Sequence, residues 1–319
     1  MAIQISGGVL LSGPVLLDPT GGSSPSPSPG GVSSGYVSGG TTPGVGNSSS
    51  IEKYSFSSDG NSTDVGDITL ARNLTTGQSS TVSGYTSGGQ EPGYPNIIDK
   101  FPFASNGNAT DVGDLTVGRG RVAGTYSADN GYTSGGYSPA GANNIIDKFS
   151  FSSDGNATDC GDMLAGTIDP VGQSSSVSGY MSGGRSPIPT VINIIQKFPF
   201  ASDGNTTDVG DLTVGRYQTA GTQSSESGYN AGGATPTRLD VIDKFPFASD
   251  SNATDVGDLL TARSALSGQS STNSGYTSGG IPAPTSTSIS KFPFASDGNA
   301  TNVGDLSVAK DDAAAGQQG

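Results

Sequence analysis

Apolar and polar positions alternate in short runs along this chain, and the same runs return at a nearly fixed interval. The clearest copy, from Lys197 to Asp211, is Lys-Phe-Pro-Phe-Ala-Ser-Asp-Gly-Asn-Thr-Thr-Asp-Val-Gly-Asp. Related copies begin at Lys53, Lys100, Lys148, Lys197, Lys244 and Lys291, spaced 47, 48, 49, 47 and 47 residues apart. Such self-similarity indicates a repeat protein, in which each unit buries its apolar face against its neighbours.

Each repeat contains signals for four short strands. A Ser-Gly-Tyr-x-Ser-Gly-Gly segment comes first, then an apolar run such as Ile97 to Phe103, then an Asp/Asn/Gly turn and a run such as Asp114 to Val117. A Gly-x-Ser-Ser segment, as in Gly77 to Ser80, precedes the next repeat. Turn residues bound these runs, and none shows the apolar period of a helix. The pattern predicts an all-β, six-bladed β-propeller with four strands per blade.

The two ends of the repeat region complement one another. The first repeat begins at Val32 and lacks the Gly-x-Ser-Ser strand, whereas the last repeat ends with Ala315 to Gly319. Aligned with Gly66 to Ser80, this tail supplies the missing strand. We therefore expect residues 32–319 to form one ring, closed by pairing of the C-terminal strand with the N-terminal blade.

Residues 1–31 are expected to form a separate N-terminal arm. Short apolar runs around Ile3 and Val15 predict one or two strands, and the Ser/Pro/Gly-rich segment from Gly21 to Gly31 predicts a linker. A frayed terminus and a strand that pairs with a neighbouring protein are both compatible with this pattern. The segment has no secretory-signal pattern, and no apolar run in the chain is long enough for a membrane helix.

Composition mainly excludes functions. The formal net charge of −14 disfavours nucleic acid and anionic membranes, because phosphate contacts require clustered Lys and Arg. The chain has no His and a single cysteine, Cys160, which replaces a valine of the other copies and is expected to be a buried small apolar residue. No polar cluster distinguishes one repeat from the rest. We therefore expect no enzymatic activity and assign no catalytic, cofactor-binding or metal-binding residues.

The turn from Asp203 to Asp211 allows two interpretations. Its oxygen-bearing side chains resemble the ligand sets of calcium loops in some propellers. The alternative, which we favour, is a turn whose Asp and Asn side chains bond nearby backbone amides. No cofactor is therefore expected, with calcium in these turns left open. The related turns are Asp59 to Asp67, Asn106 to Asp114, Asp154 to Asp162, Asp250 to Asp258 and Asp297 to Asp305.

The repeated lysines, phenylalanines and tyrosines are expected to hold the blades together. Each lysine would pair with a carboxylate of its own repeat, such as Asp67 or Asp114; the alternative is an axial channel lined by lysines that binds an anion. The two phenylalanines that flank Pro102 would share a face and pack between blades, and the proline would face an unpaired side or a bulge. The six repeated tyrosines would also pack there, with carbohydrate stacking as the alternative.

The repeat region, roughly Val32 to Gly319, resembles kelch-type β-propellers. The shared features are a Gly-Gly pair after one strand, as at Gly88-Gly89, a downstream aromatic such as Phe101, and an Arg that opens the next blade. Such arginines are Arg72, Arg119, Arg216 and Arg263. The chain departs from the kelch pattern by having no Trp and by carrying Thr167 where the third copy would have Arg.

The Lys-Phe-x-Phe-Ala and Gly-Tyr-x-Ser-Gly-Gly units are also similar to repeats in structural proteins of marine bacteriophages. This resemblance implies a non-enzymatic virion protein, tail- or capsid-associated, in a symmetric multi-copy assembly. The arm would attach to other virion proteins. The alternatives are an adhesive propeller that binds a host-surface glycan or receptor, and a kelch-like interaction module outside a virion. Recognition is expected in the variable segments Gln90 to Asn96, Tyr137 to Asn144, Arg185 to Asn193, Ala234 to Asp240 and Ile281 to Ser288.

Overall fold

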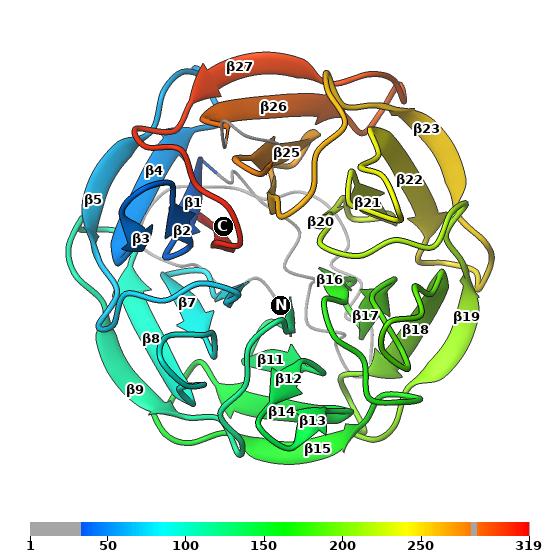
Figure 1. The fold of residues 1–319 in the computed structure, drawn as a ribbon, viewed down its shortest axis with the longest axis horizontal. Coiled ribbons are helices and arrows are strands. Elements are labelled where there is room, and N and C mark those ends of the chain that lie inside the picture. The colour runs from blue at the N-terminus through cyan, green and yellow to red at the C-terminus, as the bar shows by residue number, and fades with distance from the viewer. Residues whose placement is uncertain (1–32, 282–285, 319) are drawn as a thin grey trace, which may run out of the picture.

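The fold is a closed ring of β-sheets. The computed structural model describes residues 33–281 and 286–318, so the expected arm, residues 1–31, lies outside the described part. Six four-stranded antiparallel sheets stand as blades around a central axis, as Figure 1 shows, and the predicted all-β, six-bladed propeller is confirmed. Within the described ranges, no helix has the length and apolar character needed to cross a bilayer.

Each blade has an inner strand at the axis, then a second, a third and an outer strand. In that order, blade 1 is β28 (Ala314–Gln318), β1 (Ser34–Ser38), β4 (Ser50–Ser55) and β5 (Thr63–Asp67), and blade 2 is β6 (Thr76–Ser79), β7 (Ser83–Ser87), β8 (Ile97–Pro102) and β9 (Thr110–Asp114). Blade 3 is β10 (Ala123–Tyr126), β11 (Asn130–Ser134), β14 (Ile145–Ser150) and β15 (Thr158–Asp162), and blade 4 is β16 (Val171–Ser174), β17 (Ser178–Ser182), β18 (Ile194–Pro199) and β19 (Thr207–Asp211). Blade 5 is β20 (Ala220–Gln223), β21 (Ser227–Ala231), β22 (Val241–Pro246) and β23 (Thr254–Asp258), and blade 6 is β24 (Ser267–Ser270), β25 (Ser274–Ser278), β26 (Ser288–Pro293) and β27 (Thr301–Asp305). Two small hairpins, β2 (Thr41–Thr42) with β3 (Gly46–Asn47) and β12 (Tyr137–Ser138) with β13 (Gly141–Ala142), project from loops.

The ring closes as the sequence predicts. The C-terminal strand β28 pairs antiparallel with β1 and becomes the inner strand of blade 1. The alignment of the tail with Gly66 to Ser80 is confirmed, since Val37 faces Ala315 as the corresponding Thr86 of blade 2 faces Gly77. Ala315, and not Gly316, therefore occupies the place of the first glycine of the Gly-x-Ser-Ser strand.

The outer strand of each blade is formed by earlier residues than the sequence predicts. The sequence places it at Asp114 to Val117, but β9 is Thr110–Asp114, which is the second half of the supposed ligand turn. The chain leaves the sheet after β9 because Leu115 is buried between blades and its N–H donates to the Asn96 carbonyl at 2.7 Å. The expectation for Pro102 is confirmed, since β9 pairs with β8 only as far as Lys100, so the proline nitrogen faces no strand; the bulge lies at Ile98/Asp99 instead.

The blades pack through repeated aromatic groups. Tyr85 of blade 2 lies against Phe149 and Phe151 of blade 3, with ring centroids 5.5 and 4.8 Å apart. The equivalent tyrosine and aromatic pair meet at the other five interfaces. Aromatic pairs at these separations add to the stabilisation from buried area. The predicted interblade role of the phenylalanines and tyrosines is confirmed.

Glycine lets the inner strands approach closely around the axis. A Cβ placed on Gly77 would lie 1.6 Å from the Ala315 carbonyl oxygen, and one on Gly172 would lie 2.0 Å from that of Gly124. Real side chains do not tolerate such contacts. The glycine of the Gly-x-Ser-Ser strand is thus required by the narrow ring and not by turn geometry.

At four of the six interfaces, a buried ion pair joins the crossing segment, the stretch from one outer strand to the next inner strand, to the blade that follows it. Between blades 2 and 3, Asp147 on β14 accepts from the Thr116 N–H (3.0 Å), the Thr116 hydroxyl (2.7 Å) and the Arg119 guanidinium (2.9 Å). Arg119 also donates to the Gly135 and Thr133 carbonyls at 2.9 Å each. Both charged side chains are fully buried, so each depends on the other for compensation.

The acid and base of this pair change together from repeat to repeat. The residue on the third strand and the residue at the arginine position of the crossing segment are Asp99 with Arg72, Asp147 with Arg119, Gln196 with Thr167, Asp243 with Arg216, Ser290 with Arg263, and Glu52 with Lys310. Thr167, a departure from the kelch pattern, is therefore matched by a neutral Gln196. Only blade 6 keeps the Arg without an acid.

The paired substitution gives a test of this coupling. Asp147→Gln should lower the free energy of unfolding by about 3–5 kcal/mol, because the buried Arg119 charge loses its carboxylate. The double variant Asp147→Gln/Arg119→Thr copies the neutral pair of blade 4 and should regain most of that loss. Chemical denaturation of both variants measures the difference; a double variant less stable than the single one would contradict the coupling.

Candidate functional site

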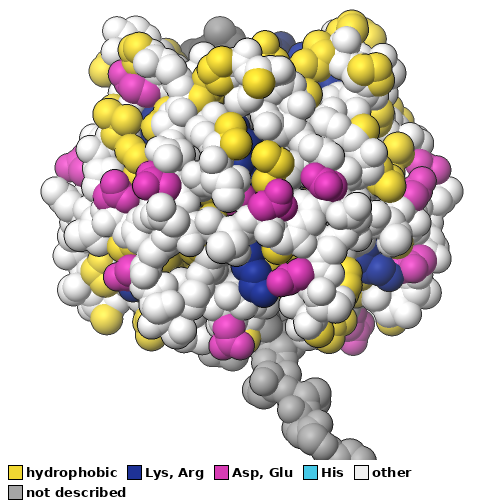
Figure 2. Space-filling model, turned by 90° about the horizontal axis from the view of Figure 1, so that it is seen from below, with side chains coloured by type: hydrophobic (Ala, Val, Ile, Leu, Met, Phe, Trp, Pro, Cys, Tyr) yellow, Lys and Arg dark blue, Asp and Glu magenta, His cyan; other side chains and the backbone are white. Residues whose placement is uncertain are grey.

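The variable segments lie on one face of the ring, around one end of its central channel (Figure 1). Isolated bridges tie them to the crossing segments, for example Asn73 to Gln90 and Gly120 to Tyr137. We call this surface the loop face; it comprises residues 41–49, 90–96, 137–144, 185–193, 234–240, 281 and 286–287. A side view shows hydrophobic side chains on the loops that project from this face, at the upper edge of Figure 2. Part of the sixth variable segment, residues 282–285, lies outside the described residues.

Six residues with positive φ surround the channel mouth. This mouth ring consists of Leu74, Arg121, Asp169, Gln218, Ala265 and Asp312, with φ angles between 51° and 62°. Five of the six adjacent pairs are linked by backbone hydrogen bonds, such as Arg121 N–H to the Leu74 carbonyl (2.9 Å) and Ala265 N–H to the Gln218 carbonyl (2.8 Å). A left-handed conformation costs a non-glycine residue about 1 kcal/mol or more. These hydrogen bonds offset part of that cost and hold the backbone from which the six side chains extend.

One part of the mouth breaks the sixfold repetition. Asp169 pairs with Arg121 at 3.1 Å and with Arg185 from the adjoining loop, and the Arg185 guanidinium lies 4.2 Å from the centre of the Tyr217 ring. The Asp169 side chain is 3% exposed, so its charge is almost completely enclosed by these partners. The expectation that no polar cluster is unique to one repeat is therefore wrong. The sequence does carry a signal for this cluster. Arg121 and Asp169 are charged at the position where other repeats have uncharged residues such as Leu74 and Ala265.

The channel behind the mouth is small. Its volume is about 130 Å³, and the inner strands and the mouth ring line it. At the far end the Gln223 amide nitrogen donates to the Tyr126 hydroxyl at 2.7 Å, which joins β20 to β10 across the axis. Because the lysines of the repeat lie on the third strands, they do not line the channel, and the lysine-lined axial channel is wrong.

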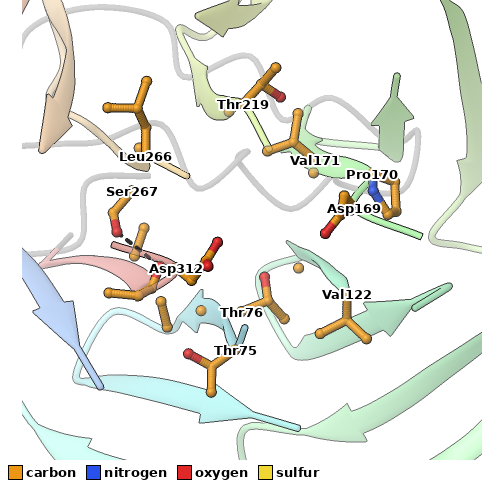
Figure 3. A pocket seen from close by; sticks show the side chains of 18 of the residues that line it. Thr75, Thr76, Val122, Asp169, Pro170, Val171, Thr219, Leu266, Ser267 and Asp312 are labelled. Atoms are coloured by element: carbon orange, nitrogen blue, oxygen red, sulfur yellow. Dashed lines mark hydrogen bonds between the residues drawn. The ribbon is translucent and has the colours of Figure 1, made fainter. Parts of the chain in front are cut away.

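Two carboxyl groups face the channel from opposite sides, as Figure 3 shows for Asp169 and Asp312. Unlike Asp169, Asp312 has no basic partner among the described residues; the Gln218 amide nitrogen lies 3.4 Å from it. Burial, followed by the negative charges of Asp311 and Asp169, raises the Asp312 pKa to about 7, although Arg121 and Gln218 oppose the shift.

The Asp312 pKa makes stability pH-dependent in a defined direction. The folded protein keeps this proton up to about pH 7, whereas an unfolded Asp loses it near pH 4, so the stability contribution is lost as pH rises between them. Asp312→Asn should therefore match the wild type at pH 4 and exceed its stability by roughly 1–2 kcal/mol at pH 8, allowing for solvent in the channel. Denaturant titrations at both pH values measure this, with the exposed Asp129→Asn as control. An equal difference at pH 4 and pH 8 would contradict it.

The repeated lysines pair with carboxylates, but of the next blade and not of their own repeat. Lys100 Nζ lies 2.8 Å from Asp154, the first residue of the next turn. The other pairs are Lys148 with Asp203, Lys197 with Asp250, Lys244 with Asp297 and Lys291 with Asp59. Where Asn106 replaces the aspartate, Lys53 keeps only the contact with the tyrosine of its own blade, 5.4 Å from the centre of the Tyr36 ring, which Lys100, Lys244 and Lys291 also make. These half-exposed pairs contribute little each, typically below about 1 kcal/mol.

The oxygens of the Asp/Asn turns are directed to different contacts. Asp208 accepts from the Gly210 N–H at 3.1 Å, Asn205 accepts from the Asp162 N–H of the preceding blade at 3.0 Å, and Asp203 pairs with Lys148. Within the described ranges, no group of three or more His, Cys, Asp or Glu side chains forms a candidate metal cluster. The observed contacts follow the favoured interpretation, in which these side chains bond backbone amides.

Aromatic residues that could meet a ligand are not the repeated tyrosines. All six of those are at most 3% exposed, and three of their hydroxyls reach backbone carbonyls at 3.4–3.5 Å. The alternative of carbohydrate stacking on them is therefore wrong. On the loop face, half-buried Tyr94 and Tyr137 from neighbouring loops have ring centroids 5.9 Å apart. Cys160 is only partly buried and packs against the apolar cluster that includes Met163 and Phe198.

Comparison with known proteins adds no family assignment. No protein-family model matches the chain, and the search of curated proteins finds no match. The propeller architecture consequently stands on the structure alone.

Proposed function

We propose that this protein is a non-enzymatic display scaffold, in which a rigid propeller presents the loop face to a partner surface. The observation that carries the proposal is the contrast between the repeated blades and the variable loops. The blades repeat the same strand order and the same interblade contacts, whereas the loops around the mouth differ in sequence and conformation. Binding residues are often carried by loops that a rigid scaffold positions.

The chemistry of the loop face supports contact with a partner. Val45 and Ile188 are 81% and 45% exposed on separate loops, and Tyr94 and Tyr137 form an aromatic pair between two others. Arg185 adds a partly exposed cation held over an aromatic ring. Aromatic residues and arginine are enriched in protein interfaces.

We further propose that the scaffold works as a structural component of a bacteriophage particle, in several copies. This setting rests on the similarity of the Lys-Phe-x-Phe-Ala and Gly-Tyr-x-Ser-Gly-Gly units to repeats in such proteins. In this arrangement residues 1–31 attach the propeller to the particle and the loop face points outward.

Quantitative mass spectrometry of gradient-purified phage particles tests the setting. We expect this chain to co-purify at a constant multi-copy ratio to the major capsid protein through successive gradients. Its recovery only in the cell fraction, with particles free of it, would reject the proposal.

A second candidate, binding of a cell-surface glycan, is favoured by the Tyr94–Tyr137 pair, because paired aromatic rings beside polar loops offer a stacking surface for a sugar. On a glycan array, binding should be lost in Tyr94→Ala/Tyr137→Ala. It should persist in the control Val82→Ser/Val177→Ser, which changes residues exposed in turns away from the loop face. Absence of binding by the folded wild type would reject the glycan candidate and leave the scaffold.

A further inference from the structure

Five of the six crossing segments direct the same backbone donor at an acceptor on the third strand of the next blade. The N–H of Thr116 donates to Asp147 at 3.0 Å, and that of Leu164 donates to the Gln196 amide oxygen at 2.9 Å. The equivalent bonds are Thr69 to Asp99, Thr213 to Asp243 and Ser307 to Glu52, at 3.1, 2.9 and 2.7 Å. The donor geometry at this place is therefore a property of the repeat.

The sixth interface keeps the donors and loses the acceptor. Ser290 occupies the position of the acid, and its hydroxyl receives the Arg263 guanidinium at 2.8 Å. No hydrogen bond from the corresponding backbone N–H, that of Leu260, is found among the described residues. At this interface a single hydroxyl stands where the other five have a carboxyl or amide group. Less side chain therefore lies between the Leu260 N–H and the Arg263 guanidinium.

Arg263 carries a positive charge that no described carboxylate compensates. Its side chain is 2% exposed, and it donates to the Gly279 carbonyl (3.1 Å) and the Ser286 hydroxyl (3.3 Å) in addition to Ser290. Its Nε–H is buried and has no acceptor in the described structure. At the related interface of blade 5, by contrast, Arg216 lies 2.6 Å from Asp243. Burial of a charge without a counter-charge is strongly unfavourable.

We propose that the crossing segment of blade 6 binds a small monoatomic anion, chloride in most solutions, between Arg263, the Leu260 N–H and the Ser290 hydroxyl. The site offers donors and a positive charge, so a cation does not fit. Compared with the neighbouring interface, the chain lacks one carboxyl group here, which suits a single ion better than the larger sulfate or phosphate. The anion takes the place of the acid that four other repeats encode, so that the stability of the interface between blades 5 and 6 depends on salt composition.

Thermal unfolding in matched salts tests the site. At equal ionic strength, the wild-type midpoint should be about 2–4 °C higher in roughly 0.2 M sodium chloride than in sodium gluconate, because an ion that binds only the folded state stabilises it by mass action. Ser290→Asp supplies the carboxylate in the chain and should remove this difference. An equal difference between the two salts in the wild type and in Ser290→Asp would overturn the proposal.

The neighbouring interface, between blades 4 and 5, can be changed to resemble the proposed anion site. Asp243→Ser reproduces the arrangement of blade 6 beside Arg216, and this variant should show a larger chloride dependence than the wild type. If Asp243→Ser does not fold, crystals of the wild type grown in sodium bromide give a direct readout, with an anomalous peak expected beside Arg263. A water molecule without anomalous signal at that position would overturn the proposal.

Discussion

The structure depends on the contact between one blade and the next, and above all on the buried acceptor that fixes each crossing segment. A blade of four short strands with an apolar third strand buries little by itself. The acceptor on the third strand, Asp147 at the interface of blades 2 and 3, binds a backbone amide, a hydroxyl and an arginine of the incoming segment. It therefore sets where the next inner strand begins and how the aromatic groups meet.

The backbone is close to sixfold, but the chemistry is not. The two residues at this buried position carry no net charge together in five repeats, whether they are Asp with Arg or Gln with Thr. The exception is Ser290 with Arg263. At the mouth ring, a strained backbone geometry is kept in every repeat while the side chains differ. Function is expected where the frame is constant and the side chains vary, which is the mouth and the loop face.

The sequence predicted what recurs in every repeat. The periodic apolar runs gave blade number, strand count and closure, because these follow from spacing alone. The assignment of the outer strand was wrong because Leu115 has the apolar character of a strand residue, although it packs in the crossing segment. The lysine partners were wrong because pairing across blades joins Lys100 to Asp154, which is distant in sequence.

The polar mouth was missed for a related reason. Arg121, Asp169 and Arg185 lie on different repeats and in segments without a common motif, so only the ring geometry brings them together. The co-variation of Gln196 with Thr167 was visible in the sequence, but its meaning required knowledge that Gln196 bonds the crossing segment that carries Thr167, through the Leu164 N–H. Repetition thus predicts the arrangement of the blades. The residues that differ between repeats can be interpreted only when the structure shows which of them are neighbours.

The central claim is that the ring is closed and that its six interfaces are equivalent in geometry. Hydrogen–deuterium exchange measured by mass spectrometry tests it most directly, because β28 is the only inner strand that reaches its blade from the other end of the chain. A closed ring predicts that amides of β28 are protected to the same degree as those of β16 and β20. Rapid exchange of β28 and β1, with protection retained in blades 3 to 5, would contradict it.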